Sequence, residues 1–224
     1  SCQSNGEKIT ALDASNCPEL EMLSCHGNRI SSLNVSNNTL LEELGCSKNP
    51  LGSLDVSNNT QLERLECSKN PLSSLDVSNN TQLKWLYCYG NKFSTAALDD
   101  IYCALPDRTG KESGLIEPVY SDTSSNHAIV LATNAQNAID KNWQVQYYYD
   151  DSGDDTDIHT TGAYVCGTPH TDIAEAAAEP ALTLYPNPVA DVLYLSATAR
   201  TIRIYNVYGI EVAHATDTDR IEVA

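Results

Sequence analysis

The chain has 224 residues and a formal net charge of −17, from 13 basic and 30 acidic side chains. A surface this negative repels phosphate, so nucleic acid and anionic membranes are poor candidates as partners. No apolar run reaches the ~20 residues that a membrane-spanning helix needs, and the length allows one or two domains.

Four cysteines in the first 92 residues stand 21 residues apart, at Cys25, Cys46, Cys67 and Cys88. A leucine precedes each cysteine by two residues, and an asparagine follows it by three. Each unit predicts a short strand, a turn at the asparagine and a return through an L-[DN]-V-S segment. Only stacking of neighbouring units can bury the shared core. The units are 9–29, 30–50, 51–71 and 72–92.

This L-x-x-L-x-C-x-x-N-x-L pattern resembles the bacterial leucine-rich repeats that carry a cysteine ladder, of the kind found in internalin J-like surface proteins. The resemblance covers residues 1–92. It implies an α/β-type solenoid, the right-handed superhelix of leucine-rich repeats, with a binding surface but no catalytic chemistry.

After Asn91 the 21-residue spacing ends and larger units follow, which we expect to cap the solenoid over residues 93–172. Ser94 can cap a helix, T-A-A-L-D-D-I-Y-C-A-L, that Pro106 stops. The patterns further predict a strand at 115–120, a short helix at 134–141 and an alternating strand at 144–149.

The last quarter of the chain changes composition, with a predicted linker at 173–180 followed by a small all-β domain at 181–224. Short alternating strands are predicted at 182–185, 192–195, 201–206 and 211–213. The Y-P-N-P segment at 185–188, with I-Y-N-x-x-G at 204–209, resembles the sorting domain of the type IX secretion system of Gram-negative bacteria.

That resemblance implies an Ig-like β-sandwich recognised by the secretion machinery during export across the outer membrane. It places the protein outside the cell or on the outer surface of a Gram-negative bacterium. Sorting domains of this family normally continue past a G-x-Y strand to a basic terminal strand. This chain ends in I-E-V-A at 221–224, so we expect the domain to be incomplete.

The eight cysteines divide into a ladder and a remainder. The four ladder cysteines project in parallel into the core, so we expect buried free thiols rather than disulfides. Cys103 and Cys166 both fall in the predicted cap and are the favoured disulfide, while Cys2 and Cys17 are a weaker candidate pair. No C-x2-C pair indicates zinc.

The best candidate for a binding site is the fourth strand, K-W-L-Y-C-Y at 84–89. A period of two turns Trp85, Tyr87 and Tyr89 outward on the concave face. These rings could form a stacking platform for a sugar ring or for an apolar side chain of a partner. Alternatively, they could pack under the cap loops that begin at Phe93. Tyr147 and Tyr149 could widen either arrangement.

Charged side chains decorate the same face as these rings. Arg64 and Glu66 are the nearest, and Glu43, Lys48 and Lys69 lie beside them. Interspersed charges on an exposed sheet are commonly just solvated. Their position beside the aromatic strand is the one reason to count these side chains as candidate ligand contacts.

An acidic run at 150–157 is the one candidate for metal binding, with carboxylates at Asp150, Asp151, Asp154, Asp155 and Asp157. Clustered oxygen ligands suit calcium, although the EF-hand spacing is missing and the run also fits a solvated loop. No catalytic motif occurs, the five histidines are scattered, and no cofactor is indicated.

The sequence therefore predicts a secreted or surface-displayed leucine-rich-repeat module that recognises a protein or a carbohydrate on its concave face. The alternative is a structural or spacer protein of the cell envelope without a specific ligand. A hydrolase of unknown type is a third hypothesis with less support, and we do not expect an enzyme.

Overall fold

The computed structural model describes residues 8–148, 157–170, 184–185, 192–205 and 211–222, and in the last three ranges it describes the backbone alone. Two compact units make up the chain, Ser1–His170 and Thr171–Ala224. Among the helices that the structure describes, none has the length and apolarity to cross a membrane.

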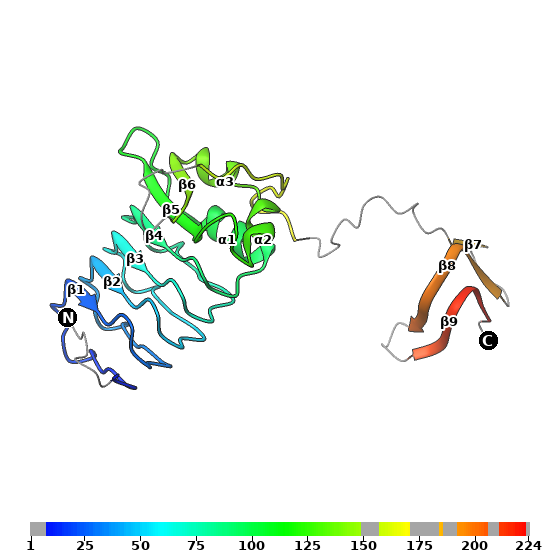
Figure 1. The fold of residues 1–224 in the computed structure, drawn as a ribbon, viewed down its shortest axis with the longest axis horizontal. Helices are drawn as coiled ribbons and strands as arrows, with labels where there is room; N and C mark the ends of the chain where they lie inside the picture. The colour runs from blue at the N-terminus through cyan, green and yellow to red at the C-terminus, as the bar shows by residue number, and fades with distance from the viewer. Residues whose placement is uncertain (1–7, 149–156, 171–183, 186–191, 206–210, 223–224) are drawn as a thin grey trace. The chain divides into compact units, whose positions relative to one another are not determined.

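The first unit is built on a six-stranded parallel sheet whose strands lie side by side in chain order (Figure 1). Four strands have three residues each and recur every 21 residues: β1 (Met22–Ser24), β2 (Glu43–Gly45), β3 (Arg64–Glu66) and β4 (Trp85–Tyr87). The register aligns Leu23, Leu44, Leu65 and Leu86 across them. The repeat and the parallel sheet confirm the predicted solenoid, with strands shorter than the L-x-x-L-x-C segment.

The core of the solenoid is a stack of equivalent side chains. The ladder cysteines Cys25, Cys46, Cys67 and Cys88 are fully buried beside the aligned leucines. Cys46, Cys67 and Cys88 are free thiols, as expected. Each buried leucine contributes about 2 kcal/mol to folding, but only because its neighbours in adjacent turns cover it.

Asparagine side chains join the turns where the short strands leave backbone groups without partners. Asn49 shows the pattern: its Nδ2 donates to the carbonyls of Cys25 and Cys46 (both 2.9 Å), and its Oδ1 accepts from the Ile30 N–H (3.1 Å). Asn28, Asn70 and Asn91 occupy the same position in their turns.

A second asparagine ladder runs along the return segments, in the second residue of each N-N-T. Asn59 is fully buried, and its Nδ2 donates to the carbonyls of Val35 (3.0 Å) and Asn38 (2.8 Å). Asn38 and Asn80 make the equivalent bonds. Every carbonyl that this second ladder binds lies in the preceding turn. The first ladder also bonds to the preceding turn, so both ladders link each repeat to its neighbour.

The cap begins with α1 (Thr95–Ala104), and the predicted N-cap is confirmed because the Ser94 Oγ accepts from the Ala97 N–H at 3.1 Å. Strand β5 (Gly114–Val119) and strand β6 (Trp143–Tyr147) extend the parallel sheet. Helix α3 (Gln136–Ile139) lies within the predicted helix at 134–141. A five-residue helix, α2 (His127–Leu131), was not predicted.

Single side chains fasten the cap. The ammonium group of Lys141 donates to the carbonyls of Tyr102 (3.2 Å), Cys103 and Leu105 (3.1 Å), which lie at the carboxyl end of α1. The buried Arg108 donates to the carbonyl of Leu83 (3.2 Å) in the last regular repeat.

The second unit contains one antiparallel sheet of three strands in the order β7 (Leu184–Tyr185), β8 (Val192–Tyr205) and β9 (Glu211–Glu222). Two strands predicted at 192–195 and 201–206 are one continuous β8, with an irregular register between Tyr194 and Ala199. The S-A-T-A-R link at 196–200 has no Gly, Pro or Asn to end a strand. The Ig-like sandwich stays a prediction.

Candidate functional site

The concave face carries rows of side chains that cross the strands in register. Arg64 pairs with Trp85, and Glu66 pairs with Tyr87, which in turn pairs with Glu117 of β5. Trp85 is 37% exposed, Tyr87 is half-buried and Tyr89 is only 8% exposed. The three predicted rings therefore sit in three different environments.

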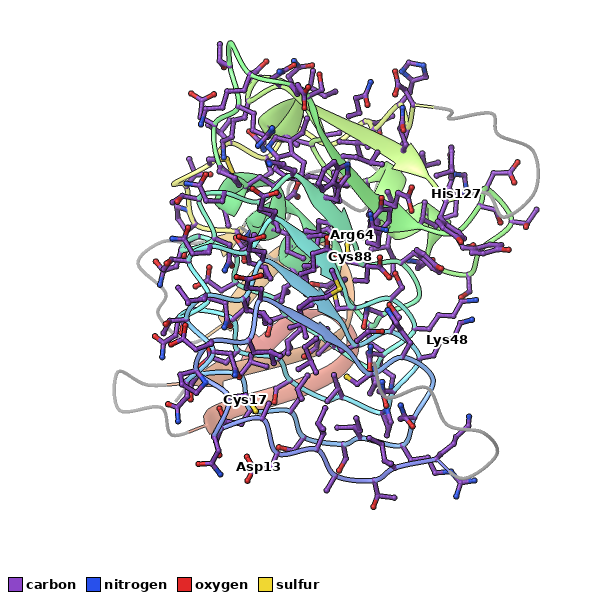
Figure 2. All side chains as sticks on the ribbon, turned by 90° about the vertical axis from the view of Figure 1, so that its left-hand side faces the viewer. Asp13, Cys17, Lys48, Arg64, Cys88 and His127 are labelled. Carbon is purple, nitrogen blue, oxygen red and sulfur yellow. A yellow bond between two sulfur atoms is a disulfide. The ribbon has the colours of Figure 1, made fainter. Side chains whose placement is uncertain are left out.

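A pocket of about 440 Å³ opens on this face over β2–β5. Ten residues line it: His26, Ser47, Lys48, Arg64, Glu66, Ser68, Tyr87, Tyr89, Glu117 and Tyr148. Four of the five predicted ligand contacts are among them, and the exception is Trp85. Figure 2 shows Arg64 over the strands and Lys48 beyond their carboxyl ends.

An aromatic wall of the pocket is formed by Tyr148 of the cap with Tyr87 and Tyr89 of the last regular repeat. Tyr148 stacks on Tyr89 with ring centroids 4.6 Å apart, and Tyr120 lies 5.6 Å from both rings. Burial and the neighbouring Tyr148 raise the pKa of Tyr89, and burial raises the pKa of Tyr87. Both phenols therefore stay protonated at neutral pH and can donate hydrogen bonds.

The expectation that Tyr147 would widen the aromatic surface is wrong. A register shift between Ile116 and Val119 pairs Val119 with Tyr147, which packs against the core. The Tyr147 hydroxyl lies 2.7 Å from Nε2 of His127 in α2. Tyr148, the next residue along the chain, lines the pocket, and Tyr149 lies outside the described residues.

A charged network forms the floor of the pocket. Arg64 Nε donates to Glu66 at 2.6 Å, and His26 Nε2 lies 3.3 Å from the other oxygen of Glu66. The guanidinium of Arg64 lies 4.8 Å from the Tyr87 ring centroid. The His26 ring lies over Gly45, where a Cβ would come within 2.2 Å of Nε2. Glycine at this position therefore leaves room for the His26 ring.

Beyond this network a second hollow of about 200 Å³ continues the groove toward β1. It shares His26, Arg64 and Glu66 with the larger pocket, and Met22, 60% exposed, lies at its far side. His26, Arg64 and Glu66 therefore separate the two hollows, and tyrosine side chains line only the larger one.

Two groups of lining residue were not among the predicted ligand contacts. The 21-residue spacing places His26, Ser47 and Ser68 at outward positions equivalent to Tyr89, without marking them as ligand contacts. Glu117 and Tyr148 belong to cap segments of irregular register, for which no repeat gives the alignment.

The other candidates from the sequence include two possible disulfides. Cys103 and Cys166 form a disulfide with their Cα atoms 5.5 Å apart. Cys17 is an exposed free thiol, and Cys2, its weaker candidate partner, lies outside the described residues.

Of the calcium candidates, only Asp157 is described, where its Oδ1 accepts from Nε2 of Gln146 at 3.0 Å. Asp150, Asp151, Asp154 and Asp155 lie outside the described residues. Within the part of the chain that is described, no cluster of His, Cys, Asp or Glu could hold a metal ion.

No protein-family model and no curated protein matches this chain. Among solved structures it is similar to the functional domain of InlJ from Listeria monocytogenes, which includes a cysteine ladder. The identity is 26%, the TM-score is 0.49, and the match covers 64% of this chain and 28% of that one. An internalin, InlF, of the same organism matches at 19% identity and a TM-score of 0.37, covering 58% and 44%. The chain thus spans less than half of either protein.

Proposed function

We propose that this chain is a secreted or surface-displayed module that binds a protein or a glycan in the pocket on its concave face. The observation that carries this proposal is the pocket of about 440 Å³ between Tyr148 of the cap and the Arg64–Glu66 pair. Ligand sites typically have volumes of ~300–1,000 Å³ and combine aromatic walls with a few convergent polar groups.

The competing proposal is a spacer protein without a specific ligand. The coverage of Tyr89 by Tyr148 favours it, because part of the aromatic strand already has a partner inside the chain. Trp85 favours binding, since it leaves 37% of its surface exposed beside the pocket. Large exposed aromatic side chains are enriched where partners bind.

The binding proposal is tested by probing the full chain against a printed glycan array and a panel of purified extracellular proteins. For a ligand found there, we expect Arg64→Ala and Tyr87→Ala each to weaken binding at least tenfold. Val165→Ala is the matched control, because Val165 is 60% exposed and does not line the pocket. Equal binding by all variants, or no ligand in either panel, would favour the spacer protein.

Exposure of the aromatic strand can be measured without any substitution. Trp143 is 2% exposed, and its Nε1 donates to the Pro106 carbonyl at 2.8 Å. Iodide should therefore quench Trp85 and leave Trp143 unquenched, and a bound ligand that covers the pocket mouth should reduce the quenching. Quenching of both indoles to the same extent would contradict the described burial.

We further propose that residues 181–224 act as a sorting domain for export across the outer membrane of a Gram-negative bacterium. The Y-P-N-P and I-Y-N-x-x-G motifs and the antiparallel strands β7–β9 support this. In a host with a type IX secretion system, the full chain should reach the cell surface or the medium. A chain ending at residue 172 should stay in the periplasm, and equal export of both would refute the proposal.

A further inference from the structure

In the turn that follows each short strand of the solenoid, one residue takes a left-handed backbone conformation. The equivalent residues are Gly27 (φ 68°), Lys48 (φ 58°), Lys69 (φ 55°) and Gly90 (φ 69°). Glycine adopts this conformation without strain, whereas a residue with a Cβ does not. The first and last turns therefore use the favourable residue, and the two middle turns use lysine.

The two lysines differ in what compensates their charge. Lys69 Nζ lies 5.0 Å from the Tyr120 ring centroid and 5.6 Å from that of Tyr89, close enough for cation–π attraction. Lys48 lines the pocket mouth instead. Across the described residues, no carboxylate lies within ion-pair distance of Lys48, whereas Arg64 and Lys84 both have one.

The rest of the lining determines what kind of anion can enter. Glu66 and Glu117 both line the pocket, so a simple inorganic anion would meet two carboxylates. The net charge of −17 also repels polyanions, so a suitable ligand must present a single anionic group to Lys48 and hydroxyl donors to the glutamates. It must also have a compact body that fits against the tyrosine rings.

We propose that the pocket holds a carboxylate-bearing sugar unit of an acidic glycan, with Lys48 binding the carboxylate. This inference rests on the proposed binding function and names its ligand class. Glu66 and Glu117 accept from sugar hydroxyls.

A peptide end that carries both an ammonium group and a carboxylate could also pair with a glutamate and with Lys48, but it fits the pocket less well. Glu66 already contacts Arg64 at 2.6 Å and His26 at 3.3 Å. Its charge is therefore compensated, and it does not require a second cation. Its oxygens can still accept hydrogen bonds from neutral hydroxyls, which a saccharide supplies in number.

The test compares galacturonic acid with its methyl ester, titrated calorimetrically into the full chain. The two probes share the sugar ring and differ in the charge of the carboxyl group. We expect the acid to bind at least tenfold more tightly than the ester, and Lys48→Gly to remove that preference. This variant should fold, because glycine already occupies the equivalent turns at Gly27 and Gly90.

Lys69→Gly is the matched control, since it makes the same change one turn away, at a residue that does not line the pocket. It should alter affinity for the acid less than about threefold. Equal binding of acid and ester, or an acid preference that survives Lys48→Gly, would overturn the inference.

Two further outcomes separate this inference from the proposed function. Binding of trialanine with the same dependence on Lys48, and of neither saccharide, would overturn the ligand class and leave a binding pocket. If no saccharide, trialanine or panel protein binds, both the inference and the proposed function fail.

Discussion

The regular repeats and the cap belong to one sheet but are held together in different ways. In residues 30–92 the same two asparagine positions link every turn to the previous one. In the cap each fastening occurs once, as with the Cys103–Cys166 disulfide or the Lys141 ammonium group. Repetition spreads stability over many equivalent bonds, whereas the cap depends on a few particular side chains.

Removing the disulfide should give the largest effect on the cap. The bond closes a loop with a sequence separation of 63 residues, for which chain entropy gives about 4 kcal/mol of stabilisation. The double variant Cys103→Ser/Cys166→Ser should lose about that much free energy of unfolding in urea titrations. Cys17→Ser, at an exposed free thiol, should change it by less than about 0.5 kcal/mol. Similar losses in both variants would contradict a special role for the bond.

The asparagine ladder can be broken at one turn. Asn59→Ala leaves the buried carbonyls of Val35 and Asn38 without these bonds, and should cost about 3 kcal/mol. Its neighbour Asn58 is exposed and makes one bond, to the Ser36 carbonyl at 3.2 Å. Asn58→Ala should therefore cost less than about 0.5 kcal/mol in the same urea titration. If the two costs are equal, the second ladder does not stabilise the solenoid.

In the cap, Lys141→Met should cost about 2 kcal/mol, because three carbonyls at the end of α1 lose a charged donor. Burial lowers the pKa of Lys141, so part of the gain from these bonds is offset by desolvation. Thermal unfolding followed by circular dichroism measures the loss. Lys111→Met, at an exposed lysine of the cap, should leave the midpoint unchanged, and a stable Lys141→Met variant would show that the helix end needs no cap.

The smallest expected effect concerns the turns that precede the second ladder. Hydrogen bonds from the side chain and backbone of Ser57 lower the pKa of Asp55. A lowered pKa in the folded state means that the carboxylate stabilises above its unfolded pKa and that this contribution is lost as pH falls.

Asp55→Asn should therefore barely change stability at pH 7 and should reduce the loss between pH 7 and pH 3, measured by urea titration. Asn34 makes the equivalent bond to the Ser36 N–H at 3.0 Å, so the amide fits this turn. The reverse variant, Asn34→Asp, should add acid sensitivity. If the pH dependence of stability is unchanged in both variants, the Asp55 carboxylate does not contribute to the acid sensitivity of the fold.

The difference between the two regions also explains what the sequence could predict. The spacing of Leu23, Cys25 and Asn28 recurs four times, so one alignment predicts the strands, the core and the first ladder. The second ladder was missed because Asn38, Asn59 and Asn80 sit inside N-N-T triplets, where hydrophobic periodicity carries no signal. The N-cap at Ser94 was predictable because it depends on local backbone geometry.

The candidate site was predicted where it lies on the regular strands and missed where it lies on the cap. Tyr87 and Arg64 follow from a period of two, which the register of β3 and β4 preserves. Tyr148 was missed because Tyr147 and Tyr149 were named instead, although Trp143 and Val145 of β6 are buried, so the same period of two turns Tyr148 outward. Glu117 was missed because β5 lies outside the 21-residue repeat, so no equivalent position marks it.

The stacked cysteines offer a built-in reporter of motion. Burial raises the pKa of Cys46 and Cys67, so neither thiol can be alkylated until its own turn opens to water. The rate at which each one is labelled by an alkylating reagent is therefore a clock for opening at that turn. Read in order along the ladder, the four clocks would tell whether the array frays from one end or opens as a whole.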